Sequence, residues 1–306
     1  MAGMAIIRHY PLNRTEFEER YDSDAACYGA IARITLRKEM KCPRCGGEAG
    51  GTMVMASVES RGVPWKKQLW QCRQCRHKFN ALGNTVLAET KLPLRTWFRL
   101  FWWMCATDEP TSARKAFSSE TQAEQGFQIK QERSAWTALQ RIRRAMMPKE
   151  KLSGTVQLGL TEVRHLYRRR GSPEACAAIA AIREPYAATI ATLPCLESDA
   201  ITQFAIRHIA PGSTIITGRA SRFDGLGVAG FVQTREPQTN PEDPFTRPRF
   251  VDQLAKHLDS CMTKVHHAQV SECNLPEYFA EFSFRHAYAY KSVGQRFYKL
   301  LQTILK

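Results

Sequence analysis

Four cysteines stand in two pairs, and each pair has two residues between its members. Cys42 and Cys45 belong to CPRCG, and Cys72 and Cys75 belong to CRQC. A tetrahedral zinc ion takes four thiolates, and a two-residue spacer lets both sulfurs of a tight turn face the same ion. The spacing therefore predicts one structural Zn²⁺ ion with all four cysteines as ligands. A redox role for a single CxxC is the alternative, and the presence of two matched pairs argues against it.

The elements that would position these cysteines are two strand-like segments between the pairs. They read GTMVMASVES at 51–60 and PWKKQLWQC at 64–72. Two metal-binding turns joined by strands are typical of a zinc ribbon, in which the ion holds the fold together and has no open position for a substrate. The other six cysteines are scattered and are interpreted as small buried apolar residues: Cys27, Cys105, Cys176, Cys195, Cys261 and Cys273.

Positive charge gathers around the predicted ribbon. The chain has a net charge of +15 and a pI near 9.5, which favours a polyanionic partner. Between residues 61 and 100 bases far outnumber acids, and aromatic residues such as Trp65 and Trp70 are interleaved with them. A solvated charged face is the alternative. The predicted nucleic-acid contacts are Arg44, Lys66, Lys67, Arg73, Arg76, Lys78, Arg95, Arg133, Arg141, Arg143 and Arg144.

Two helical segments follow the ribbon. The stretch 94–105, LRTWFRLFWWMC, is apolar nearly all round and predicts a core helix. In the second, at 129–147, an apolar stripe with three- and four-residue spacing predicts a helix with arginines off or beside the stripe; its members are Ala135, Leu139, Ile142 and Met146. A Ser/Thr-rich turn joins the two helices, a pattern similar to a helix-turn-helix element. An amphipathic packing helix with a solvated basic face is the alternative.

Several of these segments resemble a known family. RTEFEERYDSDAACYGAIARI, then KCPRCGG, then WQCRQCRHKFNALGNTVLAETKLPLRTWFRLFWWM are similar to the N-terminal half of ISXO-type bacterial insertion-sequence transposases. The resemblance covers roughly 15–105, and PEYFAEFSFRHAYAYKSVGQRFYKLLQTIL resembles the family's C-terminal ending. It implies binding to transposon-end DNA and a catalytic domain of ribonuclease H-like fold.

The second half of the chain fits such a domain in outline. Strand-like segments occur at 155–162, 175–183, 187–193, 213–217 and 231–234, and helical ones at 198–210, 249–262, 274–290 and 292–304. We therefore expect an α+β multidomain protein. Its predicted parts are an N-terminal helical segment (1–38), a zinc ribbon (39–90), a helix-turn-helix-like region (91–150) and a degenerate ribonuclease H-like transposase domain (151–306).

The resemblance also implies where metal ions for strand transfer would bind. Hard cations such as Mg²⁺ require oxygen ligands, above all carboxylates. The family's first-strand aspartate falls on Gly159 in VQLGLT, its second on Gly218 in IITGRAS, and its third ligand on Leu258. None of these side chains can bind a metal, so Mg²⁺ is not expected and no catalytic residue is assigned.

Other acids could have taken over the role. Glu162, Asp224 and Asp259 lie near the three positions in the sequence. Strand alternation, however, places Glu162 on the face opposite to Gly159, and Asp224 lies six residues past Gly218 in a glycine-rich loop. An active insertion-sequence transposase with relocated acids is therefore kept as the alternative.

The interpretation that follows is a transposase-derived, sequence-specific DNA-binding protein that no longer cuts DNA and acts as a regulator or accessory factor. A protein-interaction module built on the ribbon is a further alternative. The expected partner is double-stranded DNA, with a homodimer implied by the resemblance and no small-molecule substrate. The longest apolar run, LFWWMCA at 100–106, is too short to cross a bilayer, and no signal-peptide pattern is seen. A cytoplasmic, nucleoid-associated bacterial protein is expected.

Overall fold

The structure is a computed structural model of residues 1–306. It describes residues 9–35, 42, 44–47, 53–60, 63–83, 85–88, 90–107, 110–163, 175–236, 247–265 and 270–305; for 53–60, 63–68 and 264–265 it describes the backbone alone. The chain divides into two compact units. Unit 1 comprises residues 1–108, 113–145 and 291–306, and unit 2 comprises residues 109–112 and 146–290.

The helices of unit 1 come from both ends of the chain. They are α1 (Arg14–Arg20), α2 (Asp24–Thr35), α3 (Leu94–Ala106), α4 (Ala113–Phe117), α5 (Ser119–Gln125), α6 (Glu132–Ala145) and α11 (Val293–Ile304). Asn13 accepts a hydrogen bond from the Glu16 backbone and so begins α1. Ser292 and Gln295 form a capping box that begins α11.

Aromatic rings fill the core of unit 1. The Phe297 ring on α11 lies 5.4 Å from Phe17 on α1 and 5.8 Å from Trp102 on α3, between ring centroids. Tyr21 joins the same cluster at 4.9 Å from Phe98. Because aromatic pairs at these separations bury large areas and attract one another, the last helix of the chain is an integral part of unit 1.

A small antiparallel sheet in unit 1 follows the first cysteine pair in the sequence, and the second pair lies between its last two strands. Its strands are β1 (Met53–Ser60), β2 (Val63–Gln71) and β3 (Lys78–Phe79), in the order β1-β2-β3. Residues Met53 and Trp70 are paired at one end of the β1–β2 ladder and Ser60 and Val63 at the other. Strand β2 therefore runs directly into the second cysteine pair, which starts at Cys72.

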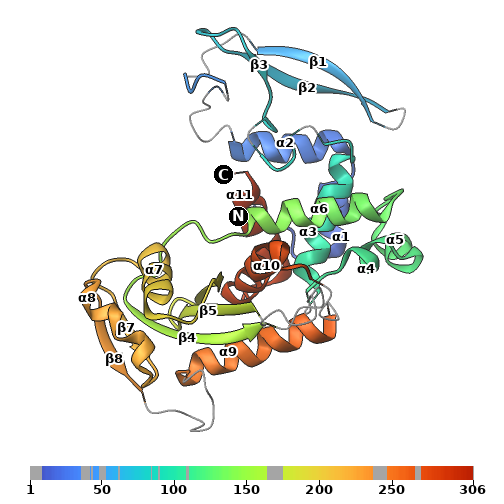
Figure 1. Ribbon diagram of the computed structural model, residues 1–306. Helices are drawn as coiled ribbons and strands as arrows, with labels where there is room; N and C mark the ends of the chain where they lie inside the picture. Colours follow the sequence, from blue (N-terminus) through green and yellow to red (C-terminus); the bar gives the residue numbers. More distant parts are fainter. Residues whose placement is uncertain are drawn as a thin grey trace, which may run out of the picture. The chain divides into compact units, whose positions relative to one another are not determined.

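Unit 2 is built on a mixed five-stranded sheet in the order β6-β5-β4-β7-β8 (Figure 1). Its strands are β4 (Thr155–Val163), β5 (Ala175–Ile182), β6 (Ala187–Leu193), β7 (Thr214–Thr217) and β8 (Val232–Arg235); its α-helices are α7 (Ser198–His208), α8 (Gly225–Val228), α9 (Arg249–Ser260) and α10 (Leu275–Ala287). β4 is antiparallel to β5 and parallel to β7. Short 3-10 or π-helical turns lie at Ser221–Phe223, Cys261–Val265 and Glu272–Asn274.

Alternate side chains of β4 enter two different cores. Val156, Leu158 and Leu160 pack with Ile201 and other residues around α7, whereas Val163 packs with residues of α9 and α10. This alternation follows from the two-residue repeat of a strand. The even-numbered positions thus face α7, and Gln157, Gly159 and Thr161 face α9.

The structure confirms the strands and helices predicted in the second half of the chain. All five strands and all four helices of the sequence prediction are present, with ends shifted by up to three residues. The core helix at 94–105 is present as α3, and all four residues of the predicted stripe on α6 are buried. Two short helices, α4 and α5, lie between α3 and α6. The predicted last domain, 151–306, differs from unit 2 because α11 belongs to unit 1.

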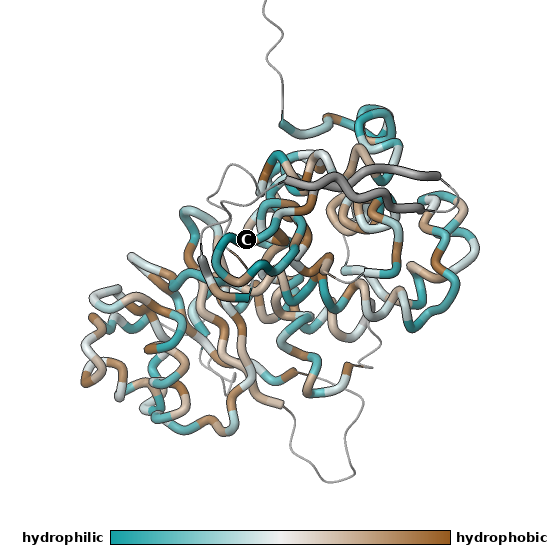
Figure 2. The backbone as a smooth tube through the Cα atoms, turned by 90° about the horizontal axis from the view of Figure 1, so that it is seen from above, coloured by the Kyte–Doolittle hydropathy of each residue, from teal (hydrophilic) through white to brown (hydrophobic). Residues whose placement is uncertain are grey.

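Apolar residues are distributed in short runs along the described chain. Figure 2 colours the backbone by hydropathy, and brown and teal residues interrupt each other along it. No helix among the described residues combines the length and the apolar character required to cross a membrane.

Candidate metal centre and nucleic-acid interface

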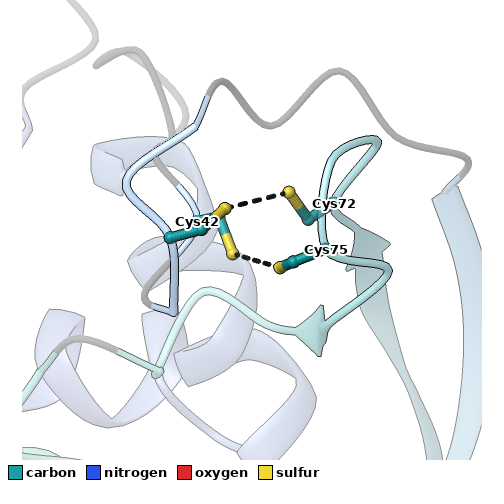
Figure 3. A group of neighbouring side chains, drawn as sticks. Cys42, Cys72 and Cys75 are labelled. Carbon is teal, nitrogen blue, oxygen red and sulfur yellow. Dashed lines mark hydrogen bonds between the residues drawn. The ribbon is translucent and has the colours of Figure 1, made fainter.

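The four cysteines of the predicted ribbon converge in unit 1. The Sγ atoms of Cys42 and Cys75 are 3.6 Å apart, and those of Cys45 and Cys72 are 3.5 Å apart. Figure 3 shows Cys42, Cys72 and Cys75 pointing toward one another from the two turns. All four sulfur atoms lie within 4.8 Å of one another. Tetrahedral Zn–S bonds of about 2.3 Å require sulfur separations of about 3.8 Å, so the four cysteines can bind a metal ion such as zinc.

The two turns have the same backbone design. In the first, the Cys42 amide donates to the Gly47 carbonyl, and the Gly46 amide donates to the Cys42 carbonyl; in the second, Cys72 donates to His77, and Arg76 donates to Cys72. The fourth residue after the first cysteine of each pair is left-handed, with φ of 70° at Gly46 and 56° at Arg76. Glycine adopts this conformation freely, and arginine adopts it at a cost.

The thiols affect one another's protonation. Backbone hydrogen bonds from Cys75 and then Gln74 outweigh a smaller desolvation effect and lower the pKa of Cys72 to about 7. At Cys45 a backbone hydrogen bond from Gly47 acts downward, but the neighbouring thiols together raise the pKa to about 12. Thiolates this close repel, and a divalent cation bound by all four would displace their remaining protons.

Several predicted DNA-contacting residues are exposed next to this centre. Arg44 lies in the first turn, and Arg73, Arg76 and Lys78 lie in or directly after the second; all four are exposed. Lys66 and Lys67 lie on β2, opposite Ser57 and Ala56, and their side chains are outside the described part. Folding around one metal ion would therefore present four cations together.

Other predicted contacts have structural partners. Arg141 donates from Nη1 to the Val86 and Ala88 carbonyl oxygens, 3.3 Å from each, and so connects α6 to the segment that follows β3. Arg95 lies 3.2 Å from the Glu18 carboxylate. Arg143 is 1% exposed, which corrects its expected place on a surface: position 143 follows the buried Ile142 and turns into the core of unit 1. Arg133 and Arg144 are exposed on α6.

In unit 2, the space around Gly159 is filled. A Cβ atom at Gly159 would lie 2.9 Å from Val251 Cγ1 and 3.0 Å from Arg247 Cγ. Real Cβ atoms essentially never show the first separation, and the second is tighter than nine in ten of their contacts. Neither neighbouring atom is the far end of a long flexible side chain. The position that the resemblance assigns to a metal-binding aspartate is therefore closed by side chains from the start of α9 and the residues before it.

Gly218 lies close to Gly159 in the sheet. Gln157 of β4 is paired in parallel with Ile216 of β7, so two residues further along each strand the chain reaches Gly159 and Gly218. Gly218 is buried and follows the fully buried Thr217, whose hydroxyl donates to the Gly218 carbonyl at 3.0 Å. Two of the three expected ligand positions, Gly159 and Gly218, are thus neighbours on adjacent parallel chain segments, and neither has a side chain.

The third position does not join them as predicted. The α9 residue against Gly159 is Val251, and Leu258 lies seven residues, or about 10 Å, further along the helix. Leu258 is buried among the apolar residues between the sheet and α9–α10. The contacts therefore support Val251, and not Leu258, as the α9 position facing the β4 glycine.

An ion-pair network lies where the metal ligands are expected. Arg247 Nη2 is 3.3 Å from Asp252 Oδ1, and Lys256 Nζ is 2.8 Å from Asp252 Oδ2. Arg247 Nη1 also donates to the Thr161 hydroxyl at 3.3 Å. The side chains of Arg247 and Asp252 are 14% and 12% exposed. A partly buried guanidinium thus occupies a place where the resemblance expects a divalent cation.

The sequence did not single out Arg247 and Asp252. Arg247 lies in a loop before α9, and its partner on β4 is remote in sequence, so no local spacing connects them. Asp252 is in the first turn of α9, where an acid is explained by the helix dipole alone. In the sequence, the signal that could have pointed to Arg247 was Gly159 itself, because a glycine within an apolar strand leaves space that a neighbouring side chain fills.

Among the residues that the structure describes, the four cysteines are the one convergent group of three or more His, Cys, Asp or Glu side chains. Glu162 is exposed on the α7 side of β4. Asp224 pairs with Arg235 of β8, and Asp259 lies at the far end of α9. The described contacts do not bring these three acids together.

Comparisons with known proteins add little. No family model and no curated protein matches the sequence. Among solved structures, the chain is similar to one in the complex of a simian T-cell lymphotropic virus intasome with the PP2A regulatory subunit B56 gamma, at 10% identity and a TM-score of 0.30. The match covers 62% of this chain and 66% of that one. A TM-score this low does not establish a shared fold.

Proposed function

We propose that this protein is a DNA-binding descendant of ISXO-type transposases that has lost the ability to cut DNA. It acts as a regulator or an accessory factor at double-stranded DNA. The sequence resemblance on either side of the cysteine pairs and at the C-terminus supports the descent. The mixed sheet of unit 2, with β4 at its centre, supports the ribonuclease H-like assignment.

The main support for the loss of DNA cutting is that side chains fill the space at Gly159. Strand transfer by two metal ions requires carboxylates that hold both ions over the reacting phosphodiester. Here Gly159 and Gly218 supply no ligand, and Val251 and Arg247 take the volume that an aspartate at position 159 would need. The described acids nearest in sequence are dispersed, which weighs against the alternative of an active transposase with relocated acids.

The cations around the cysteine centre support DNA as the partner. Four exposed basic side chains lie in or beside the two metal-binding turns, and the chain as a whole carries a net charge of +15. Phosphate contacts of this kind give binding that weakens steeply with salt. A protein-interaction module would not require this charge. Double-stranded DNA, a homodimer and a cytoplasmic, nucleoid-associated location remain parts of the proposal.

To test whether DNA cutting is lost, the purified protein is incubated with Mg²⁺ or Mn²⁺ and with labelled transposon-end DNA. We expect binding without nicking or joining. Cleavage that disappears in Asp224→Asn or Glu162→Gln protein would overturn the proposal in favour of relocated acids. Loss of cleavage in Asp252→Asn protein would have the same consequence.

The test of DNA binding removes charge without disturbing the fold. Arg44→Ala/Arg73→Ala/Lys78→Ala should weaken duplex binding and reduce the slope of log K against log salt by about 2 to 3, since each lost phosphate contact contributes about 0.9. The matched control is Lys149→Ala/Arg207→Ala/Lys299→Ala, which removes three exposed cations elsewhere. Zinc content should stay the same in both. Equal loss in the two variants would refute a specific role of the ribbon.

A further inference from the structure

An aromatic cluster with two exposed tyrosines lies in unit 2. Tyr186, in the turn between β5 and β6, is 46% exposed, and Tyr290, after α10, is 63% exposed. The centroid of Tyr186 lies 6.4 Å from that of Tyr290, 5.7 Å from His286 and 6.2 Å from Phe250. We call these four residues the aromatic platform. It places two accessible rings on the buried Phe250 ring and the half-buried His286 ring.

The base of the platform holds the exposed rings in place. Phe250 is 7% exposed, and its ring lies 5.8 Å from His286. The Phe282 ring is nearly parallel to His286, at 5° and 6.4 Å. Because these rings are packed, Tyr186 and Tyr290 lose little additional freedom when a ligand covers them.

Positive charge accompanies the rings. The Arg183 guanidinium lies 5.3 Å from the centroid of Phe250, and both Arg183 and Arg249 are exposed. Glu184 is the exposed acid in the same turn. The Nε2 atom of His286 is buried and has no hydrogen-bond partner, and burial, followed by the charge of His257, lowers the pKa of this imidazole. The platform therefore has a cationic side and an unsatisfied polar atom at its base.

We propose that the aromatic platform binds an unpaired base of a DNA strand. Exposed rings beside arginine are the features with which proteins bind single-stranded nucleic acid, because every base offers a stacking face and arginine attracts the backbone. A purely apolar protein partner would not use the guanidinium. The inference rests on the proposed function and adds to it a preference for duplexes that end in, or open to, unpaired bases.

The position of the platform in the sheet supports this role. The Phe250 backbone amide donates to the Gln157 side chain at 3.1 Å, and Gln157 faces the same side of β4 as Gly159. The next residue, Val251, contacts the Gly159 position. A DNA strand that passes over the start of α9 would therefore bring its bases beside the platform.

The test compares three DNA probes with the full-length protein: a blunt duplex, the same duplex with a three-nucleotide overhang, and the single strand. Tyr186→Ala/Tyr290→Ala should weaken binding of the overhang and single-strand probes by about five- to 100-fold and leave blunt-duplex binding unchanged. Tyr186→Phe/Tyr290→Phe keeps both rings and should bind like wild type. The control Val228→Ala/Val232→Ala alters two exposed apolar residues, 93% and 59% exposed, at the opposite end of the sheet.

Each outcome separates this inference from the proposed function. Tyr186→Ala/Tyr290→Ala protein that binds all three probes like wild type would overturn the platform. The same loss of binding for all three probes would also overturn it. In both cases, duplex binding by the wild-type protein would still support the proposed function. Binding of the single strand through the tyrosines without any duplex binding would support the platform and refute the proposed duplex partner. Capture of a protein instead of either probe, abolished by the same variant, would also refute the inference.

Discussion

The cysteine centre of unit 1 and the central strands of unit 2 differ in what the structure places where the sequence led us to look for metal ligands. In unit 1 the four ligands are present and their sulfur atoms lie within 4.8 Å of one another. In unit 2, Gly159 and Gly218 stand where the resemblance places carboxylates, and Val251 and Arg247 fill the space beside Gly159. Apolar packing on both faces stabilises the sheet of unit 2 without an ion, whereas we expect the three-stranded ribbon to depend on a bound metal ion.

The largest effect should follow from removing a thiolate. Cys72→Ser should lose the metal and unfold the ribbon, because structural zinc supplies on the order of 10 kcal/mol of apparent binding free energy to a small domain. Zinc analysis and limited proteolysis of the ribbon would measure this. Cys195→Ser, at an exposed cysteine of unit 2, is the control. A ribbon that stays folded and protected after Cys72→Ser would break the comparison.

The unit 2 half of the comparison is tested by a carboxylate at position 159. Gly159→Asp should destabilise unit 2 by about 2 to 4 kcal/mol, since it overpacks a closed site and buries a charge. It should not restore Mg²⁺ binding, even combined with Gly218→Asp. Gly227→Asp is the control, because nothing lies within 4 Å of a Cβ there. Urea unfolding with and without Mg²⁺ measures both the loss of stability and any Mg²⁺ binding. Stabilisation of the variant by Mg²⁺ would contradict the prediction.

In unit 1, ion pairs add a smaller stabilisation. Glu18 lies 2.6 Å from both Arg14 and Arg99, and although desolvation raises the pKa of this carboxyl, the arginines lower it overall. A lowered folded pKa means that the stabilisation is present above the ordinary pKa and is lost as the pH falls through the folded value. Glu18→Gln should cost about 1 to 3 kcal/mol at neutral pH, and Glu19→Gln, at an exposed site, close to nothing. Equal losses in thermal unfolding would refute the assignment.

The smallest effect concerns acid sensitivity of unit 2. Burial lowers the pKa of His286, so its neutral form is preferred in the folded state. Stability from this residue is full above the ordinary histidine pKa of about 6.5 and declines as the pH falls below it. His286→Phe should flatten the pH dependence of unit 2 unfolding below about pH 6.5. Hydrogen exchange of β5 and β6 measures it; an unchanged pH dependence would exclude His286 as its source.

Much of the fold could be predicted because its signals are local. The strand-like segment at 155–162 and the apolar stripe at 135–146 each depend on residues close in sequence, and both were confirmed. The cysteine pairs predicted their own convergence, since a two-residue spacer fixes the turn. The place of Arg143 was not predictable in the same way: a run of arginines on a helix indicates a basic surface, and only the packing of α6 shows that one of them is buried.

By itself, the sequence determined four thiolates at metal-binding spacing, and glycine instead of a carboxylate at 159 and 218, where the resemblance places metal ligands. These are properties of residue identity and short spacing. The tertiary structure alone decided that Arg247 and Val251 close the space at Gly159, that α11 completes unit 1, and that Tyr186 and Tyr290 meet. Such contacts join residues far apart in the chain, and they depend on packing, which no local pattern encodes.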